Sequence, residues 1–419
     1  MHTRAVRLYG ANDLRLETFE LPPLQDDEIL VRIKSDSICM STHKLLIQGT
    51  KHKRCPADVA THPVMIGHEF AGDIVEVGAK WQGEFTPGEK FAQQPALNYQ
   101  GKLDSPGYSY QWCGGSATYA IMPHEVMELG CLLHYDGDSY FGASLGEPMS
   151  CIVGGYHGNY HTNKQDYSHQ MGIRPGGHVL ILGGAGPMGL GAVEYPLAVE
   201  PRPAQIVVAD VDPARLARAR ELFPAEATHG VTVTFVNSRD HADPAAYLRE
   251  LTGGHGYDDV FVYAPIRELA ELGDRLLAFD GCLNFFAGPS DAGFLAEMNL
   301  YNVHYSATHI MGTTGGTTDD LKEALGLAAS GAIRPAVMVT HIGGIDSIID
   351  AVTRLPQIPG GKKLTYPGIE LPLTAIDDFG ALGETDPLFA DLAASCARHQ
   401  GLWNAEAEAI LLRAKGDAA

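Results

Sequence analysis

The chain has 419 residues, of which 51 are Asp or Glu and 30 are Lys or Arg, so its formal net charge is −21. This length indicates two or three domains. A content of 45% hydrophobic and 19% charged residues argues against a mainly disordered protein. The negative charge argues against nucleic acid or an anionic membrane as partner, because its field repels phosphates. An anionic substrate would therefore need a local basic patch.

The first residues, MHTRAVRLYG, lack the basic segment and unbroken apolar run of a secretory signal, and no later stretch reaches 18 uninterrupted apolar residues. We therefore expect a cytoplasmic protein. The seven cysteines are scattered along a long chain, which is a poor framework for disulfides. We expect each to be a reduced thiol or a metal ligand.

The first part of the chain reads as short strands. Apolar and polar residues alternate in segments 4–10, 14–20, 28–35 and 72–78, and Gly and Pro separate these segments. This pattern predicts an antiparallel β domain, either a small barrel or a sandwich.

From about residue 176 the pattern changes. Continuous apolar strands are expected at 178–182, 206–210, 258–264 and 281–288, with a helix at 213–223 between the second and third. Strands that alternate with helices indicate a parallel sheet built from βαβ units. Two further helices are expected, at 319–331 and 405–415.

A glycine pattern directly follows the strand at 178–182. Gly184, Gly186 and Gly189 have the spacing of a dinucleotide-binding turn, and Asp210 ends the next strand, where its carboxylate can accept hydrogen bonds from ribose hydroxyls. Such a carboxylate would repel a 2′-phosphate, so NAD(H) is favoured, while the nearby Arg215 keeps NADP(H) possible. A glycine-rich turn without a dinucleotide is the alternative. The candidate cofactor-binding residues are Gly184, Gly186, Pro187, Met188, Gly189, Asp210 and Arg215.

The β-rich half also holds candidate metal ligands. Cys39 lies in SDSICMSTHK, His68 and Glu69 lie in GHEFAGDIVEVG, and Glu147 lies in SLGEPMSC. Thiolate, imidazole and carboxylate are the ligand types of a catalytic Zn²⁺ site with one open position. Taken singly, each residue has a plainer interpretation, such as a buried thiol or a solvated acid.

Together these motifs resemble the zinc-containing medium-chain dehydrogenase/reductase family, which includes alcohol, sorbitol and threonine dehydrogenases. The GHE box is followed at the family spacing by Gly72 and Gly78, then by PGEKF at 87–91, the EP dipeptide at Glu147 and the dinucleotide turn. The resemblance implies a GroES-like β-barrel catalytic domain at 1–155, a Rossmann domain with a doubly wound parallel sheet at 156–316, and a return to the first domain at 317–419. It also implies a homodimer or homotetramer.

Within this family the chain looks most similar to the L-sorbose 1-phosphate reductases, through segments 38–54 and 338–346 and an extension from about Gly368. The resemblance implies zinc-dependent hydride transfer between NAD(P)H and a ketose phosphate carbonyl, such as reduction of L-sorbose 1-phosphate to D-glucitol 6-phosphate. One alternative is a polyol or secondary-alcohol dehydrogenase with an unphosphorylated substrate. Another is a cofactor-binding relative without turnover.

The resemblance also assigns roles to residues. Cys39 and His68 would bind zinc with Glu147 or Glu69, and Ser41 would relay a proton. The usual relay histidine is replaced by Lys44, and His43 is adjacent, so the second half of the relay is open. Only Cys113 lies where the family's structural zinc lobe has four cysteines, so one zinc per chain is predicted.

The densest basic run is Lys51-His52-Lys53-Arg54, about a dozen residues after Cys39. We expect Lys51, Lys53 and Arg54 to bind the substrate phosphate, because Lys and Arg donors match phosphate oxygens. A solvated loop or a salt-bridge patch between subunits is the alternative.

Overall fold

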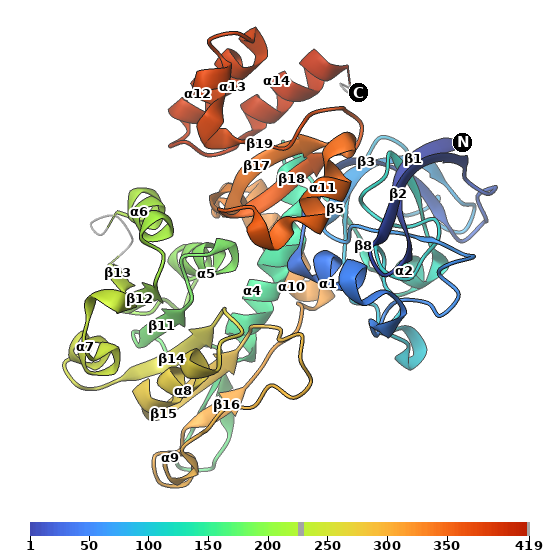
Figure 1. The fold of residues 1–419 in the computed structure, drawn as a ribbon. Helices are drawn as coiled ribbons and strands as arrows, with labels where there is room; N and C mark the ends of the chain where they lie inside the picture. The colour runs from blue at the N-terminus through green and yellow to red at the C-terminus, as the bar shows by residue number, and fades with distance from the viewer. Residues whose placement is uncertain (225–229, 417–419) are drawn as a thin grey trace. The chain divides into compact units, whose positions relative to one another are not determined.

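The computed structural model describes residues 1–224 and 230–416 (Figure 1). The chain forms two compact units, one of Met1–Pro148 with the chain from Thr317 onward, and one of Met149–Gly316. None of the described helices has the length and apolar character needed to cross a membrane.

The first unit is built on a large, mostly antiparallel sheet. Its strands follow the order β19-β17-β18-β3-β5-β6-β8, with β7 also paired to β3, and a smaller sheet has the order β2-β1-β4. Antiparallel pairing of β18 with β3 brings the end of the chain back into the N-terminal sheet. The strands are β1 (His2–Gly10), β2 (Asp13–Glu20), β3 (Ile29–Ile38), β4 (Val64–Met65), β5 (Phe70–Val77), β6 (Lys90–Gln93), β7 (Tyr119–Met122), β8 (Leu132–His134), β17 (Val339–Gly344), β18 (Lys362–Tyr366) and β19 (Thr374–Ala375).

The glycine of the GHE box and the next glycine after it are both required by close packing. Gly67 has a φ of +88°, and a β-carbon there would collide with the carboxylate of Asp36. A β-carbon at Gly72 would collide with the carbonyl oxygen of Arg32 on the neighbouring β3. These glycines let β5 lie close against β3, so the residues between them, His68 and Glu69, enter β5 next to the end of β3.

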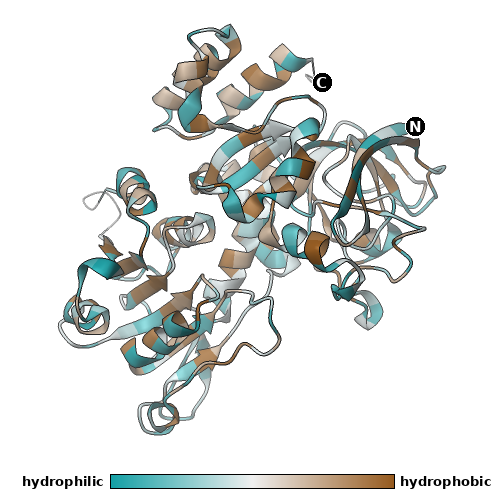
Figure 2. Cartoon of the chain, in the orientation of Figure 1, coloured by the Kyte–Doolittle hydropathy of each residue, from teal (hydrophilic) through white to brown (hydrophobic). Residues whose placement is uncertain are grey.

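The second unit contains a six-stranded parallel sheet in the order β13-β12-β11-β14-β15-β16. Figure 2 shows much of its central strands in brown, which matches the burial of most of their side chains and their apolar runs. The order reverses between β11 and β14, and in doubly wound sheets ligands bind beyond the carboxyl ends of the strands at such a point. The strands are β11 (His178–Leu182), β12 (Gln205–Asp210), β13 (Thr232–Asn237), β14 (Tyr257–Val262), β15 (Leu277–Phe285) and β16 (His309–Met311).

The predicted fold class is confirmed, and the strands expected from the alternating and apolar patterns are present. The expected helices are present as α6 (Pro213–Leu222), α10 (Thr318–Ala329) and α14 (Ala405–Lys415). The sequence patterns did not predict several other elements. Among these are α4 (Gly146–Gly158), the hairpin β9 (Tyr160–Thr162) with β10 (His169–Met171), and α12 (Phe379–Leu382) and α13 (Pro387–Arg398) in the C-terminal extension.

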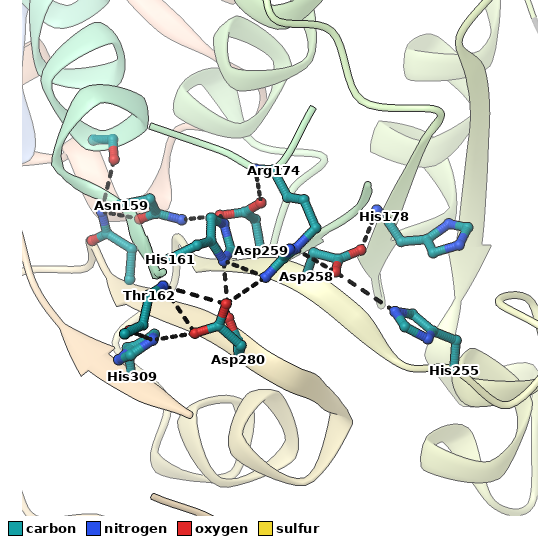
Figure 3. Close-up of polar contacts among 12 residues, drawn as sticks. Asn159, His161, Thr162, Arg174, His178, His255, Asp258, Asp259, Asp280 and His309 are labelled. Atoms are coloured by element: carbon teal, nitrogen blue, oxygen red, sulfur yellow. Dashed lines mark hydrogen bonds and ion pairs between the residues drawn. The ribbon is translucent and has the colours of Figure 1, made fainter. Parts of the chain in front are cut away.

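A buried polar cluster fastens the β9–β10 hairpin to the parallel sheet (Figure 3). Asp259 accepts hydrogen bonds from the side chain of Asn159 at 2.7 Å and from Nε2 of His161 at 3.3 Å. Asp280 accepts from Arg174 at 2.7 Å and from His309 of β16 at 2.9 Å. These groups lie toward the amino ends of the strands, away from the ligand-binding end of the sheet, so we interpret the cluster as structural.

Candidate active site

Two neighbouring strands bring the candidate metal ligands together. Cys39 directly follows β3, and His68 and Glu69 directly precede β5, which is paired antiparallel with β3. One ligand atom from each of these three side chains lies within 4.8 Å of the other two. The structure therefore groups three of the four predicted ligands, and their thiol, imidazole and carboxylate donors fit zinc.

Glu69 is a buried carboxylate with a fixed cationic partner. The Nζ of Lys362 on β18 lies 2.7 and 2.6 Å from its two oxygens, and the Ser37 hydroxyl donates to it. Burial acts to raise the pKa of Glu69, but the charges of Lys362 and His68 and the hydrogen bonds from Lys362 and Ser37 together outweigh burial and hold the pKa below its usual range. Glu69 is therefore ionised, and Lys362 competes with any metal for its oxygens.

Glu147 lies beside this group without belonging to it. It is in the first turn of α4. Its negative charge acts to raise the pKa of His68, and the charges of Glu69 and Cys39 act to raise the pKa of Glu147. Burial, with the negative charge of Glu69 as the next cause, raises the pKa of Glu147 to about 7.

A hydroxyl pair contacts the candidate ligand His68. The Tyr108 hydroxyl donates to Oγ of Ser41 at 2.8 Å, and both hydroxyl oxygens lie 3.3 Å from Nε2 of His68. Tyr108 is 5% exposed, and its ring centroid lies 4.8 Å from that of His68. Ser41 and Tyr108 therefore both contact a predicted zinc ligand, and the hydrogen bond from Tyr108 orients the Ser41 hydroxyl.

One of the two residues considered for the second half of the relay is bonded away from the site. His43 is 2.8 Å from the carbonyl oxygen of Val352 through Nδ1, so that ring is tied to a distant helix turn. The positive charge of Lys44 lowers the pKa of His52, which belongs to the basic run.

The basic run lies against Tyr108. The His52 ring stacks on the Tyr108 ring with centroids 5.6 Å apart and planes at 7°, and the Arg54 guanidinium lies 5.3 Å from the Tyr108 centroid. Burial, then the charges of Arg54, Lys53 and Lys44, lowers the pKa of His52 to about 4. Among the described acidic side chains, none forms an ion pair with Lys51, Lys53 or Arg54.

The glycine turn has the geometry that a dinucleotide loop needs. A β-carbon at Gly189 would collide with backbone atoms of Gly184, and a β-carbon at Gly184 would press on Ile181 and Val208, so both glycines are sterically required. Gly186 precedes α5 (Pro187–Ala198), where Pro187 takes the first position and Met188 follows, leaving free N–H groups at the helix start.

Asp210 and Arg215 both approach this turn. The Asp210 carboxylate accepts a hydrogen bond from the backbone N–H of Ala185 at 2.9 Å. The nearest atom to a β-carbon built on Gly186 is Nη1 of Arg215, at 3.9 Å. The structure therefore brings the predicted acidic and basic residues to the glycine turn.

Comparison with known proteins assigns the chain to a family. Residues 25–129 match the alcohol dehydrogenase GroES-like domain, and residues 187–330 match the zinc-binding dehydrogenase domain. A mannitol-1-phosphate 5-dehydrogenase from Aliivibrio fischeri and an L-sorbose 1-phosphate reductase from Klebsiella pneumoniae are each 48% identical to the chain, over 98% of it and 97% of their own lengths. The chain belongs to the zinc-binding medium-chain dehydrogenase family.

This membership confirms the resemblance read from the GHE box and the glycine turn. The dehydrogenase is an oxidoreductase of the alcohol and polyol dehydrogenase class that uses zinc and a nicotinamide cofactor. A solved 2R,3R-butanediol dehydrogenase from Bacillus subtilis has the same fold, with a TM-score of 0.71 at 21% identity, over 87% of this chain and 99% of its own.

Sequence reasoning missed two residues of this dehydrogenase's site. Lys362 reaches Glu69 from a strand 293 positions later, and Tyr108 reaches Ser41 across 67 positions. The strand that carries Lys362 has the sequence KKLTY, and this local pattern does not distinguish Lys362 from a solvated lysine. Cys113, which lies where the family's structural zinc lobe has four cysteines, is buried with its sulfur 3.8 Å from the sulfur of Met122. That the chain binds a single zinc stays a prediction.

Proposed function

We propose that this dehydrogenase reduces the carbonyl of a ketose phosphate with a nicotinamide cofactor, with L-sorbose 1-phosphate as the expected substrate and D-glucitol 6-phosphate as the product. The observation that carries the proposal is the position of the basic run. Arg54 and His52 lie on Tyr108, and Tyr108 contacts both Ser41 and His68. A phosphate at the run would lie close to the proposed metal ligands, as a small sugar phosphate requires. The names of the two relatives at 48% identity also favour phosphorylated substrates.

Zinc would be held by Cys39 and His68, with Glu69 or Glu147 as the carboxylate ligand. When bound, zinc supplies a Lewis acid that polarises the substrate oxygen. Lys362 keeps Glu69 ionised at the site, and the side chains around His68 exclude water, which strengthens local electrostatic interactions.

Proton movement falls to the hydroxyl pair. Because Tyr108 donates its hydroxyl hydrogen to Ser41, the Ser41 hydrogen is free to be donated to an oxygen held beside His68. Tyr108 is itself held by the stacked His52 ring, so the residues that orient the proton donor also border the proposed phosphate site.

For the cofactor we propose NAD(H) as the preferred form. Asp210 ends β12 at the glycine turn, where its negative charge would repel the 2′-phosphate of NADP(H). Arg215 stands near Gly186 and could offset part of this repulsion.

A kinetic panel tests the proposal. L-sorbose 1-phosphate, fructose phosphates, free fructose and sorbitol are each assayed with both nicotinamide cofactors, and a chelator control tests the need for metal. We expect the highest kcat/KM for a ketose phosphate with NADH and loss of turnover after chelation. A higher kcat/KM for free fructose or sorbitol would instead establish the alternative, an unphosphorylated polyol substrate.

A further inference from the structure

The C-terminal extension contributes one buried carboxylate, which contacts both α3 (Tyr140–Ser144) and β18 near the proposed metal site. Glu408 of α14 is 3% exposed. Its oxygens accept hydrogen bonds from the backbone N–H groups of Tyr140 at 2.7 Å and Phe141 at 2.8 Å, and from the Tyr366 hydroxyl at 2.8 Å. The indole N–H of Trp403 donates in turn to the Tyr366 hydroxyl at 2.7 Å.

The first two bonds fix the short helix α3, which leads directly into α4 and Glu147. The side chain of Tyr140 continues this link, because its hydroxyl donates to Asp73 of β5 at 2.8 Å, four residues after Glu69. The position of α3 therefore affects the positions of both candidate carboxylate ligands, Glu69 and Glu147.

The third bond fixes the far end of β18. Tyr366 ends that strand, and Lys362, the partner of Glu69, begins it. Glu408 thus holds together α3, which precedes Glu147, and β18, which carries the cation of Glu69. All three of its neighbours donate hydrogen bonds that the ionised carboxylate accepts, and these bonds oppose the burial that raises the pKa of Glu408 to about 7.

We propose that Glu408 is a positioning residue for the metal site, and that the C-terminal extension acts as a brace that sets the spacing of Glu69 and Glu147. The inference rests on the proposed zinc ligands. Residues that orient metal ligands from behind typically change metal affinity about 10- to 100-fold when they are replaced.

The test compares Glu408→Gln with Glu406→Gln. The glutamine at 408 keeps the size of the side chain, but its amide nitrogen cannot accept a backbone N–H, so one bond to α3 is lost. Glu406 lies on the same helix and is bonded to Ser395 and Arg398, both within the extension, so it is a matched control. A third variant, Tyr366→Phe, removes only the hydroxyl that links Glu408 to β18.

Metal binding is measured by competition with a chelating indicator for zinc, and by the visible absorption spectrum of the cobalt(II)-substituted protein. We expect Glu408→Gln to weaken zinc binding about tenfold and to alter the cobalt spectrum, with Tyr366→Phe changing both in the same direction. Glu406→Gln should match the wild type. In steady-state kinetics, kcat should fall more than KM rises for the sugar phosphate.

The inference is overturned if Glu408→Gln lowers the thermal midpoint but leaves zinc affinity and the cobalt spectrum unchanged, because the brace would then only stabilise the fold. If Glu408→Gln does not fold, the same criterion applies to Tyr366→Phe. Failure of the substrate proposal is separate, since a wild type that binds zinc but prefers unphosphorylated sugars leaves the metal measurements intact.

Discussion

At the residue scale, Glu69 and Lys362 form an ion pair in the interior of the first unit. Both side chains are at most 5% exposed, and both carboxylate oxygens contact the ammonium nitrogen. Such a pair adds little to the free energy of unfolding, because the cost of desolvating the two charges offsets their attraction. Removing one partner is costly, since it leaves the other charge buried and uncompensated.

Lys362→Met should therefore destabilise the metal-free protein by about 3–5 kcal/mol, as measured by urea unfolding. The double variant Glu69→Gln with Lys362→Met should recover a large part of that loss, because neither charge of the pair remains. Equal stability of the single and double variants would show that the pair is not the source of the cost.

At the element scale, the β9–β10 hairpin depends on the histidine–aspartate cluster shown in Figure 3. Burial acts to lower the pKa of His161, but the hydrogen bond to Asp259, the negative charge of Asp259 and the hydrogen bond to the carbonyl oxygen of Asp280 together outweigh burial and leave the pKa raised. Arg174, which faces the same ring, opposes this effect. Because the folded pKa lies above the unfolded value near 6.5, this stabilisation is complete below about pH 6.5 and is lost as pH rises through the folded pKa.

The stability of the wild type should accordingly fall more steeply with rising pH above 6.5 than that of His161→Gln, in urea unfolding followed at a series of pH values. His169→Gln is the control, because His169 is exposed on the facing strand of the same hairpin. It should keep the wild-type slope. If His161→Gln keeps that slope as well, the histidine does not gain a proton on folding.

The same scale shows what sequence patterns can predict. Strands such as β11 and β12 carry continuous apolar runs, and α14 has the amphipathic residues of a good helix former, so their patterns are sufficient. Helix α4 contains four glycines and a proline, so its form depends on burial rather than on propensity. Helix α13 does carry a readable signal, because Asp386 caps it and Pro387 takes its first position.

The candidate site divides in the same way. Cys39, His68 and Glu69 are found by motif, because each stands next to a strand end. The contributions of Tyr108 and Lys362 depend on contacts between distant parts of the chain, which no local pattern encodes. Glu408 is a further residue that the sequence did not single out, because the residues around it are those of an ordinary solvent-exposed helix.

At the scale of the whole molecule, the expected homo-oligomer has a candidate surface in the second unit. Four apolar side chains before and within α9 (Leu300–Tyr305) are 64–74% exposed, and Ile310 of β16 at the edge of the parallel sheet is 39% exposed. The four are Leu295, Leu300, Tyr301 and Tyr305. Contiguous exposed apolar residues often mark protein–protein contacts.

We therefore predict that Leu300→Glu with Tyr301→Glu lowers the mass of the particle in sedimentation equilibrium, because charges there oppose burial. Leu103→Glu is the control, since Leu103 is an exposed apolar residue of the first unit. A wild type that sediments as a monomer, or a double variant with unchanged mass, would contradict this assignment of the surface.

The net charge of −21 sets the background for substrate recognition, because a phosphate must find positive charge in a field that repels it. The basic run meets this need beside Tyr108. Replacing Lys51, Lys53 and Arg54 with Ala removes three positive charges from it. Replacing Lys80, Lys322 and Arg398 removes the same charge from exposed ion pairs elsewhere and is the control.

The most direct measurement is the ratio of kcat/KM for L-sorbose 1-phosphate to that for free L-sorbose in these two triple variants. We predict that the basic-run variant lowers the ratio at least tenfold, since charge-assisted hydrogen bonds contribute about 1.5–3 kcal/mol each, and that the control keeps the wild-type ratio. An equal fall in kcat/KM for both substrates, or an equal effect of both variants, would contradict phosphate recognition by this run.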